Sequence, residues 1–191
     1  NDNGFHQVDY SYNKNLDHEI KTVKSKWIVD ASGRSAILKR KLNLQSTVEH
    51  NIGASWFRIN KEIDISQWKA KTSSDKNYAK WKKRIPDHIR HLSTCHFMGK
   101  GYWVWIIPLA SKATSIGIVA DGALYPHADI LTFDKSLQWL HKHEPQLADI
   151  IEQYKDKRMD FRTLKNYSYD IKQVYSSHRW AITGESGAFL D

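Results

Sequence analysis

The residues best suited to chemistry in this chain are two tryptophans, Trp103 and Trp105, in the hexapeptide W-V-W-I-I-P that ends at Pro108. Residues two apart on an extended strand point to the same face, so this spacing predicts two indole rings side by side. The proline then stops the strand. Two wide, flat rings can pack in a hydrophobic core, or they can form a wall against a flat aromatic ligand such as a flavin.

A carboxylate and a glycine follow an apolar strand in the segment V-D-A-S-G-R, residues 29–34. Asp30 ends the expected strand, Gly33 would let the backbone approach a ligand, and Arg34 could reach a phosphate. Ligands of open α/β sheets lie at the carboxyl ends of strands, which favours a cofactor at this turn. The alternative is an ordinary strand-to-helix turn in which Asp30 only caps the helix.

The segment T-G-E-S-G-A-F-L-D, residues 183–191, has the same arrangement near the end of the sequence. A short strand delivers Gly184 and Glu185 into a run of small residues, and Asp191 follows. The Glu185 carboxylate could accept hydrogen bonds from ribose or ribityl hydroxyls. The alternative is a turn carboxylate that contacts no ligand.

The ten histidines and the single cysteine offer no comparable site. No histidine pair has a third partner at metal-ligand spacing, so the sequence indicates no metal site. Cys95 and His96 are adjacent on an expected strand, where neighbouring side chains point to opposite faces. A nucleophilic cysteine–histidine pair is therefore not expected.

The 191 residues carry 29 Lys and Arg against 21 Asp and Glu, a net charge of +8. We expect one partial domain over residues 1–191, with enough chain for a core. The lysines are scattered, which is typical of a solvated basic surface. A basic, aromatic-rich module for single-stranded nucleic acid is the alternative, but no RNP-type or zinc-finger spacing supports nucleic acid as a partner.

A single cysteine cannot form an internal disulfide, and it fits a cytoplasmic protein. No run approaches the roughly 18 to 20 apolar residues of a membrane span, so no membrane partner is expected. The polar beginning N-D-N-G does not resemble a signal peptide.

The apolar pattern predicts an α+β fold with a large, mostly antiparallel sheet that carries helices on one side. Strand patterns cover residues 5–12, 20–30, 52–59, 92–97, 102–109, 114–120 and 179–183, and residues 161–174 are ambiguous. Helical patterns cover residues 35–42, 78–83, 133–140 and 145–154. Turns near residues 99–101 and 110–112 predict an antiparallel meander.

In their order along the chain, the three segments resemble the flavin-dependent halogenases of the tryptophan type, within the larger group of FAD-dependent monooxygenases. W-x-W-x-I-P is the signature of those halogenases. The V-D-A-S-G-R segment resembles the second FAD-proximal motif of the wider group, and the G-E-S-G segment resembles its G-D-A-x-x-F-x-D-P motif. The resemblance covers nearly the whole chain and implies the substrate-side sheet with pieces of the FAD site.

This resemblance implies FAD-dependent halogenation of a small, electron-rich aromatic substrate, free or bound to a carrier. Reduced FAD, supplied by a partner flavin reductase, would activate oxygen, and halide would be converted to hypohalous acid. The positions implied to contact FAD are Asp30, Gly33, Arg34, Gly184, Glu185 and Asp191, and those implied to form a wall beside flavin and substrate are Trp103, Trp105 and Pro108. An FAD-dependent hydroxylase or reductase of the same fold is the alternative.

Three departures from the family pattern bear on what this chain can do. Glu185 stands where the family has aspartate. No G-x-G-x-x-G follows a strand, so the phosphate-binding beginning of the FAD domain is absent. The family's catalytic lysine belongs to that upstream part, so the catalytic residues stay unknown. We therefore expect an internal fragment, without the N-terminal and C-terminal regions, that binds FAD weakly and is inactive alone.

Overall fold

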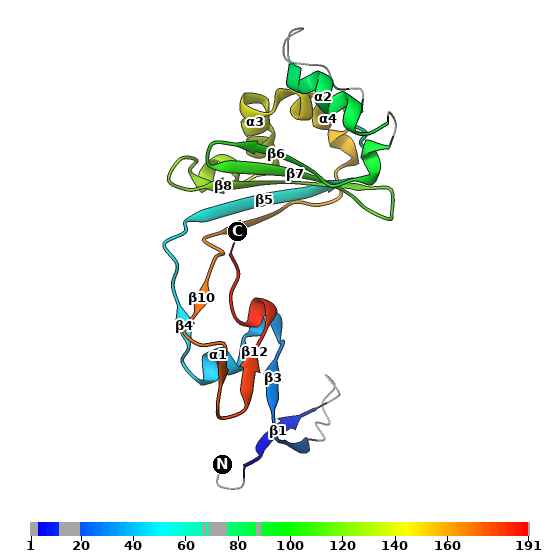
Figure 1. Cartoon of the computed structure of the whole chain (residues 1–191). Coiled ribbons are helices and arrows are strands. Elements are labelled where there is room, and N and C mark those ends of the chain that lie inside the picture. Colours follow the sequence, from blue (N-terminus) through cyan, green and yellow to red (C-terminus); the bar gives the residue numbers. More distant parts are fainter. Residues whose placement is uncertain (1–3, 12–19, 67, 69–75, 87–88, 191) are drawn as a thin grey trace. The chain divides into compact units, whose positions relative to one another are not determined.

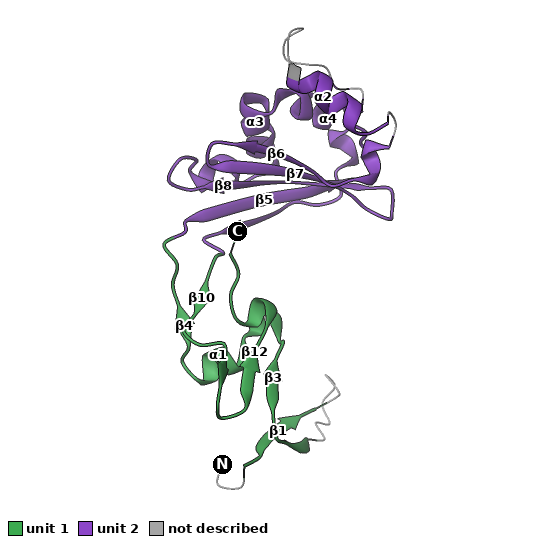
Figure 2. Ribbon diagram, in the orientation of Figure 1, with its two compact units in different colours: residues 1–49, 168–191 green, residues 50–167 purple. Residues whose placement is uncertain are grey.

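The computed structural model describes residues 4–11, 20–66, 68, 76–86 and 89–190. Contacts within the chain divide it into two compact units (Figure 2). The larger unit is His50–Tyr167, and the smaller unit combines Asn1–Glu49 with Ser168–Asp191. The expectation of one partial domain over residues 1–191 stays a prediction.

An antiparallel sheet of five strands forms the larger unit (Figure 1). Its strand order is β6 (Cys95–Gly99), β7 (Tyr102–Pro108), β8 (Thr114–Asp121), β5 (Ile52–Ile59) and β9 (Arg162–Lys165). The first three form the meander that the turn residues predict, and β5 pairs with β8 along its whole length. Gly101 has a φ of +71°, which the tight turn between β6 and β7 requires.

Helices cover one face of this sheet. α3 (Phe133–His143) begins after Thr132, whose side chain accepts a hydrogen bond from the backbone N–H of Lys135, and α4 (Pro145–Gln153) begins with a proline. Figure 1 shows both on the same side of the sheet as α2 (Lys76–Arg84). The predicted α+β fold, with helices on one side of a large antiparallel sheet, is confirmed. The 3-10 helices of this unit are η2 (Arg90–Leu92), η3 (His127–Ile130) and η4 (Lys155–Lys157).

The hydrophobic core lies between this sheet and the helices α3 and α4. Side chains alternate between the two faces of a strand, so every second strand residue enters the core. On β7 these residues are Val104 and Ile106, which are 0% and 3% exposed. Their partners on β8, Ile118 and Ile116, are fully buried, as is Leu140 of α3.

The smaller unit consists of short strands. β1 (His6–Tyr10) and β2 (Lys21–Ser25) form an antiparallel hairpin, and β4 (Gln45–Ser46) pairs with β10 (Asp170–Ile171). A three-stranded sheet has the order β11 (Tyr175–Ser176), β12 (Trp180–Ile182) and β3 (Ile28–Asp30). In it β12 and β3 run parallel, and each leads into a 3-10 turn: η1 (Gly33–Ser35) follows β3, and η5 (Gly184–Ser186) follows β12. α1 (Ile37–Lys41) comes after η1.

One strand prediction is wrong in the smaller unit. Residues 20–30 form two strands rather than one, because β2 pairs with β1 whereas β3 pairs with β12, and the chain changes partner at Lys26 and Trp27. In the larger unit, β6 begins at Cys95 rather than at residue 92, because η2 occupies the preceding residues. The ambiguous stretch 161–174 contains β9 and β10.

Candidate functional site

Trp103 and Trp105 lie on the face of the large sheet that is turned away from the helices. The residues between and after them, Val104 and Ile106, belong to the core, whereas neither indole does. The two ring centroids are 5.5 Å apart, and the ring planes make an angle of 42°. The prediction that the two indoles share a face is confirmed, and the pair is not part of the core beneath the helices.

The indole of Trp105 is held in place by two residues of β8. Its Nε1–H donates a hydrogen bond to the hydroxyl of Ser115 at 3.2 Å. Its ring covers Gly117, its partner across the strand pair, and a Cβ added at Gly117 would lie closer than 3.0 Å to three ring carbons. Pro108 ends β7 opposite Thr114, as predicted from the sequence.

A third tryptophan, Trp56 of β5, was missed in the sequence. It pairs with Gly117 from the side opposite Trp105, so all three positions lie in one row across the sheet. The alternating pattern of residues 52–59 places Trp56 away from Phe57, a core residue. That alternation predicts the face of Trp56, but its nearness to Trp105 depends on the pairing of β5 with β8, which the sequence does not show.

Cys95 and His96 point to opposite faces of β6, as expected. Cys95 packs against the core, where burial raises the pKa of its thiol, with Arg90 opposing that shift and Asp64 adding to it. On the other face, the rings of His96 and Trp103 form a T-shaped pair with centroids 5.3 Å apart. The two side chains therefore form no nucleophilic pair.

In the smaller unit, Asp30 is 6% exposed at the end of β3. Its Oδ1 accepts a hydrogen bond from the backbone N–H of Ser32 at 2.9 Å, and its Oδ2 accepts one from Leu38 at 2.7 Å. Burial alone would raise the pKa of Asp30, but hydrogen bonds, those from Ser32 and Leu38 among them, outweigh it, and the pKa lies below its ordinary value. These are the hydrogen bonds expected if Asp30 caps the helix that follows β3. A contact of Asp30 with FAD stays a prediction.

Gly33 and Gly184 occupy equivalent places in the turns after the two parallel strands. Their φ angles are +60° and +61°, in the left-handed region that favours glycine. A Cβ added at either would meet nothing within 4 Å, so backbone conformation, and not crowding by this chain, explains both glycines. The side chains that follow, Arg34 and Glu185, are exposed. Asp191 lies outside the described residues.

Lys39 of α1 connects this helix to the turn after β12, and nothing in the sequence distinguishes it from the scattered surface lysines. It is 5% exposed, and its Nζ donates to the carbonyl of Gly187 at 2.6 Å. The same Nζ lies 4.0 Å from the ring centroid of Tyr169, whose hydroxyl donates to the carbonyl of Glu185. Burial lowers the pKa of Lys39, and Arg40 adds to that shift while Asp170 and Asp30 oppose it.

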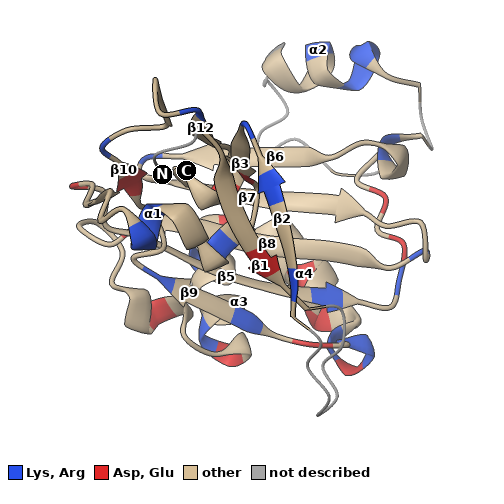
Figure 3. Cartoon of the chain, turned by 90° about the horizontal axis from the view of Figure 1, so that it is seen from below, with Lys and Arg blue, Asp and Glu red and all other residues tan. Residues whose placement is uncertain are grey.

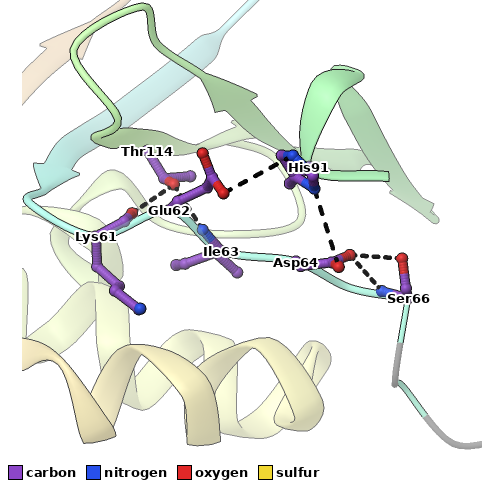
Figure 4. A network of polar contacts seen from close by, with 7 residues as sticks. All are labelled: Lys61, Glu62, Ile63, Asp64, Ser66, His91 and Thr114. Atoms are coloured by element: carbon purple, nitrogen blue, oxygen red, sulfur yellow. Dashed lines mark hydrogen bonds and ion pairs between the residues drawn. The ribbon is translucent and has the colours of Figure 1, made fainter. Parts of the chain in front are cut away.

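A polar network in the larger unit involves His91 of η2 (Figure 4). Its Nε2 lies 3.8 Å from Oε1 of Glu62, and its Nδ1 lies 4.0 Å from Oδ2 of Asp64. Asp64 also accepts hydrogen bonds from the backbone and hydroxyl of Ser66. Among the described residues no group of three or more His, Cys, Asp and Glu is arranged to hold a metal ion.

The basic residues that the structure describes lie on many elements. In Figure 3, Lys and Arg are distributed over many elements, with Asp and Glu between them. This agrees with the scatter of lysines along the sequence. No helix in the described part of the chain is long and apolar enough to cross a membrane.

The turns after β3 and β12 have properties that suit the polar part of a flavin cofactor. Two glycines leave open space at the carboxyl ends of adjacent parallel strands, where backbone can approach a ligand closely. Arg34 can pair with a phosphate, and Glu185 can accept hydrogen bonds from hydroxyl groups. The residues present therefore fit such a group.

Comparison with known proteins defines the class of fold. No family model matches the chain. Its fold is shared by flavoproteins, flavin-dependent halogenases among them. A crystal structure of the halogenase PltM with phloroglucinol and FAD aligns over 97% of this chain and 37% of PltM, with a TM-score of 0.67 and 18% identity. A flavoprotein/dehydrogenase from Cytophaga hutchinsonii aligns over 98% of this chain and 40% of its own, with a TM-score of 0.65 and 16% identity.

Curated relatives by sequence are halogenases. The flavin-dependent halogenase chlA of Dictyostelium discoideum is 25% identical over 173 residues, which are 89% of this chain and 27% of chlA. A 1H-pyrrole-2-carbonyl-[peptidyl-carrier protein] chlorinase of Pseudomonas fluorescens is 28% identical over 169 residues, which are 88% of this chain and 34% of the chlorinase. The chain thus spans about a third of the length of the relatives it matches.

Proposed function

We propose that this chain is part of an FAD-dependent halogenase of the tryptophan type, an oxidoreductase that halogenates an electron-rich aromatic substrate. One observation carries the proposal. The tryptophans of W-V-W-I-I-P lie side by side on the sheet face that is turned away from the core. Similarity to halogenases over nearly nine tenths of this chain supports it. A cytoplasmic location, expected from the single cysteine, belongs to the same proposal.

The proposal assigns roles to the residues of both units. Arg34, Glu185 and the backbone at Gly33 and Gly184 would hold the phosphate and hydroxyl groups of FAD, and Asp30 and Asp191 are further candidates. When bound and reduced by a partner flavin reductase, FAD would supply the chemistry that activates oxygen, which is the oxidant for halide. Trp103, Trp105 and Pro108 would keep the substrate away from the flavin because their side chains are bulky and rigid.

Relatives indicate two substrate classes. The chlorinase from Pseudomonas fluorescens is named for a pyrrole bound to a peptidyl-carrier protein, and PltM was crystallised with phloroglucinol. Both rings are electron-rich, which suits attack on hypohalous acid. We therefore propose a small phenol or pyrrole as substrate, either free or bound to a carrier.

The test uses the full-length protein that contains this chain. It is incubated with FAD, a flavin reductase with its nicotinamide donor, bromide or chloride, and phloroglucinol or a carrier-bound pyrrole. Mass spectrometry should find a product in which halogen replaces hydrogen, and omitting halide should abolish it. A hydroxylated product formed at the same rate with and without halide would refute halogenation and favour the hydroxylase alternative.

Two other functions remain as outcomes of experiments. The dehydrogenase from Cytophaga hutchinsonii shares the fold, so the fold alone does not distinguish a halogenase from a reductase. A nucleic-acid module would bind oligonucleotides with an affinity that falls steeply with salt. The scattered basic residues do not favour that outcome.

A further inference from the structure

Two side chains of the smaller unit hold the turn after β12, which we call the η5 turn (residues 184–187), by its carbonyl groups. Lys39 of α1 donates a hydrogen bond from Nζ to the carbonyl of Gly187 at 2.6 Å. Tyr169 donates one from its hydroxyl to the carbonyl of Glu185 at 2.7 Å. The two carbonyls are two residues apart, so the backbone of the turn is held at two points.

The charge of Lys39 is buried, which costs free energy unless the ammonium group gains partners. The side chain is 5% exposed. Within the described part of the chain, Nζ has its hydrogen bond to Gly187 and lies over the ring of Tyr169, whose centroid is 4.0 Å away. The contacts that compensate for the burial of Lys39 are therefore contacts to the η5 turn and to the second residue that holds this turn.

Tyr169 is itself fixed in place. Its backbone N–H donates to the carbonyl of Phe189 at 2.9 Å, and the backbone N–H of Phe189 donates back to Tyr169 at 2.9 Å. Burial raises the pKa of the Tyr169 hydroxyl, with Glu185 adding to that shift and Arg34 opposing it. At neutral pH the hydroxyl therefore keeps its proton and remains a donor to the turn.

One side of the η5 turn faces the protein and the other is accessible. Ser186 and Gly187 are buried, whereas Gly184 and Glu185 are exposed. A Cβ added at Gly184 would meet no atom of the described chain within 4 Å. The turn thus has an inner part that Lys39 contacts and an outer part that a ligand can reach.

We propose that Lys39 and Tyr169 are positioning residues of the FAD site, because they hold the η5 turn in the conformation that binds the ligand. The identification of that ligand as FAD rests on the proposed function. The groups they position are the Glu185 carboxylate and the backbone at Gly184, which would contact hydroxyl groups of FAD. A binding group is effective only when the residues behind it hold its geometry. The Glu185 side chain has several rotatable bonds, so fixing its backbone limits where the carboxylate can lie.

The experiment measures FAD binding to the full-length protein that contains this chain, by calorimetry. Lys39→Met removes the donor and nearly keeps the length of the side chain. It should weaken FAD binding by about tenfold to 100-fold, the range for losing a residue that orients a binding group. Tyr169→Phe loses a neutral hydrogen bond and should weaken binding by about twofold to tenfold. Lys172→Met, at an exposed lysine of the same unit, is the matched control and should bind FAD as the unmodified protein does.

Two further measurements distinguish positioning from a general loss of structure. In a double-mutant cycle, Glu185→Gln should weaken FAD binding by a clearly smaller factor in Lys39→Met than in the unmodified protein, because a misplaced carboxylate has less binding to lose. Hydrogen exchange without FAD should become faster at the amides of Gly187 and Phe189 in Lys39→Met. Exchange at the amides of β12 should stay unchanged and would show that the unit is folded.

Each outcome decides a point. Unchanged FAD affinity in Lys39→Met would overturn the role of Lys39, and unchanged affinity in Tyr169→Phe would overturn that of Tyr169. Equal factors for Glu185→Gln in both backgrounds would show that Lys39 does not act through Glu185 and would overturn the positioning role. If Lys39→Met also speeds exchange at β12, the unit has lost its fold, and Tyr169→Phe, which keeps the ring against Lys39, decides the proposal.

The same measurements separate this inference from the proposed function. A full-length protein that binds FAD but does not halogenate would refute the proposed function and leave the roles of Lys39 and Tyr169 to the variants. A full-length protein that binds no FAD would refute both.

Discussion

Gly117→Ala is the sharpest test of how Trp105 packs against β8. Adding one methyl group to β8 would place a carbon closer than 3.0 Å to three ring carbons of Trp105. Ordinary carbon contacts are wider, so the indole would have to move by about 1 Å. The hydrogen bond to Ser115 is already 3.2 Å long, and a displacement of that size would break it.

The expected cost combines three terms. Overpacking of a well-packed site costs about 1 to 3 kcal/mol. Loss of the bond to Ser115 costs about 1 kcal/mol. Replacing glycine by alanine within a strand returns about 0.5 to 1 kcal/mol, because glycine is less favourable there. The last two terms nearly cancel, so Gly117→Ala should lower the free energy of unfolding by about 1 to 3 kcal/mol.

The assay is urea denaturation followed by the NMR signals of the backbone amides in β5, β7 and β8. These three strands belong to the larger unit, so their signals report on that unit alone. A double-mutant cycle with Trp105→Ala supplies the control. Once the indole is removed, Gly117→Ala should be neutral or stabilising. If Gly117→Ala destabilises equally in both backgrounds, or in neither, the explanation of Gly117 by the Trp105 ring is wrong.

Three further predictions concern other parts of the chain. Gly33→Ala should cost about 1 to 2 kcal/mol through its left-handed backbone alone, and Gly33→Asn should cost less; urea denaturation followed at the amides of η1 and α1 checks both. Burial, with Lys165 adding, holds the pKa of His127 below its ordinary value, so the unfolded chain binds that proton more tightly. Stability should therefore be highest above about pH 6.5 and fall as pH is lowered, with a smaller slope in His127→Gln. Trp139→Ala should cost about 3 to 5 kcal/mol and Trp105→Ala clearly less, because only Trp139 lies in the core; equal losses in thermal unfolding would contradict this.

The sequence predicts the large sheet well because the relevant signals are local. Alternation of apolar residues on β5, β7 and β8, together with turn glycines, marks strands and their order in the meander. The placement of β5 beside β8 and of β3 beside β12 joins residues far apart in the chain, and no local pattern specifies such pairs. The break between β2 and β3 was missed for this reason, since it follows from a change of partner.

The candidate site was predictable to a similar degree. The glycines of the two turns could be identified because left-handed backbone selects glycine whatever lies around it. Lys39 could not, because its burial depends on Gly187 and Tyr169, which are distant in sequence. Asp30 was correctly placed at the end of a strand, yet only the structure shows that both its oxygens accept backbone hydrogen bonds.

Side chains of β7 alternate between the two faces of the sheet, and this alternation both completes the core and exposes the tryptophan pair on the opposite face. Val104 and Ile106 must face the helices to complete the core, and this requirement directs Trp103 and Trp105 to the opposite face. A shift of β7 by one residue would bury both indoles and expose two core side chains, so its cost opposes any such slip. The energy of the core therefore fixes which face carries the indoles, and β8 refines their angle through Ser115 and Gly117. A pair of indoles displayed in this way needs no extra stabilisation of its own, because the fold that buries its neighbours already holds it in place.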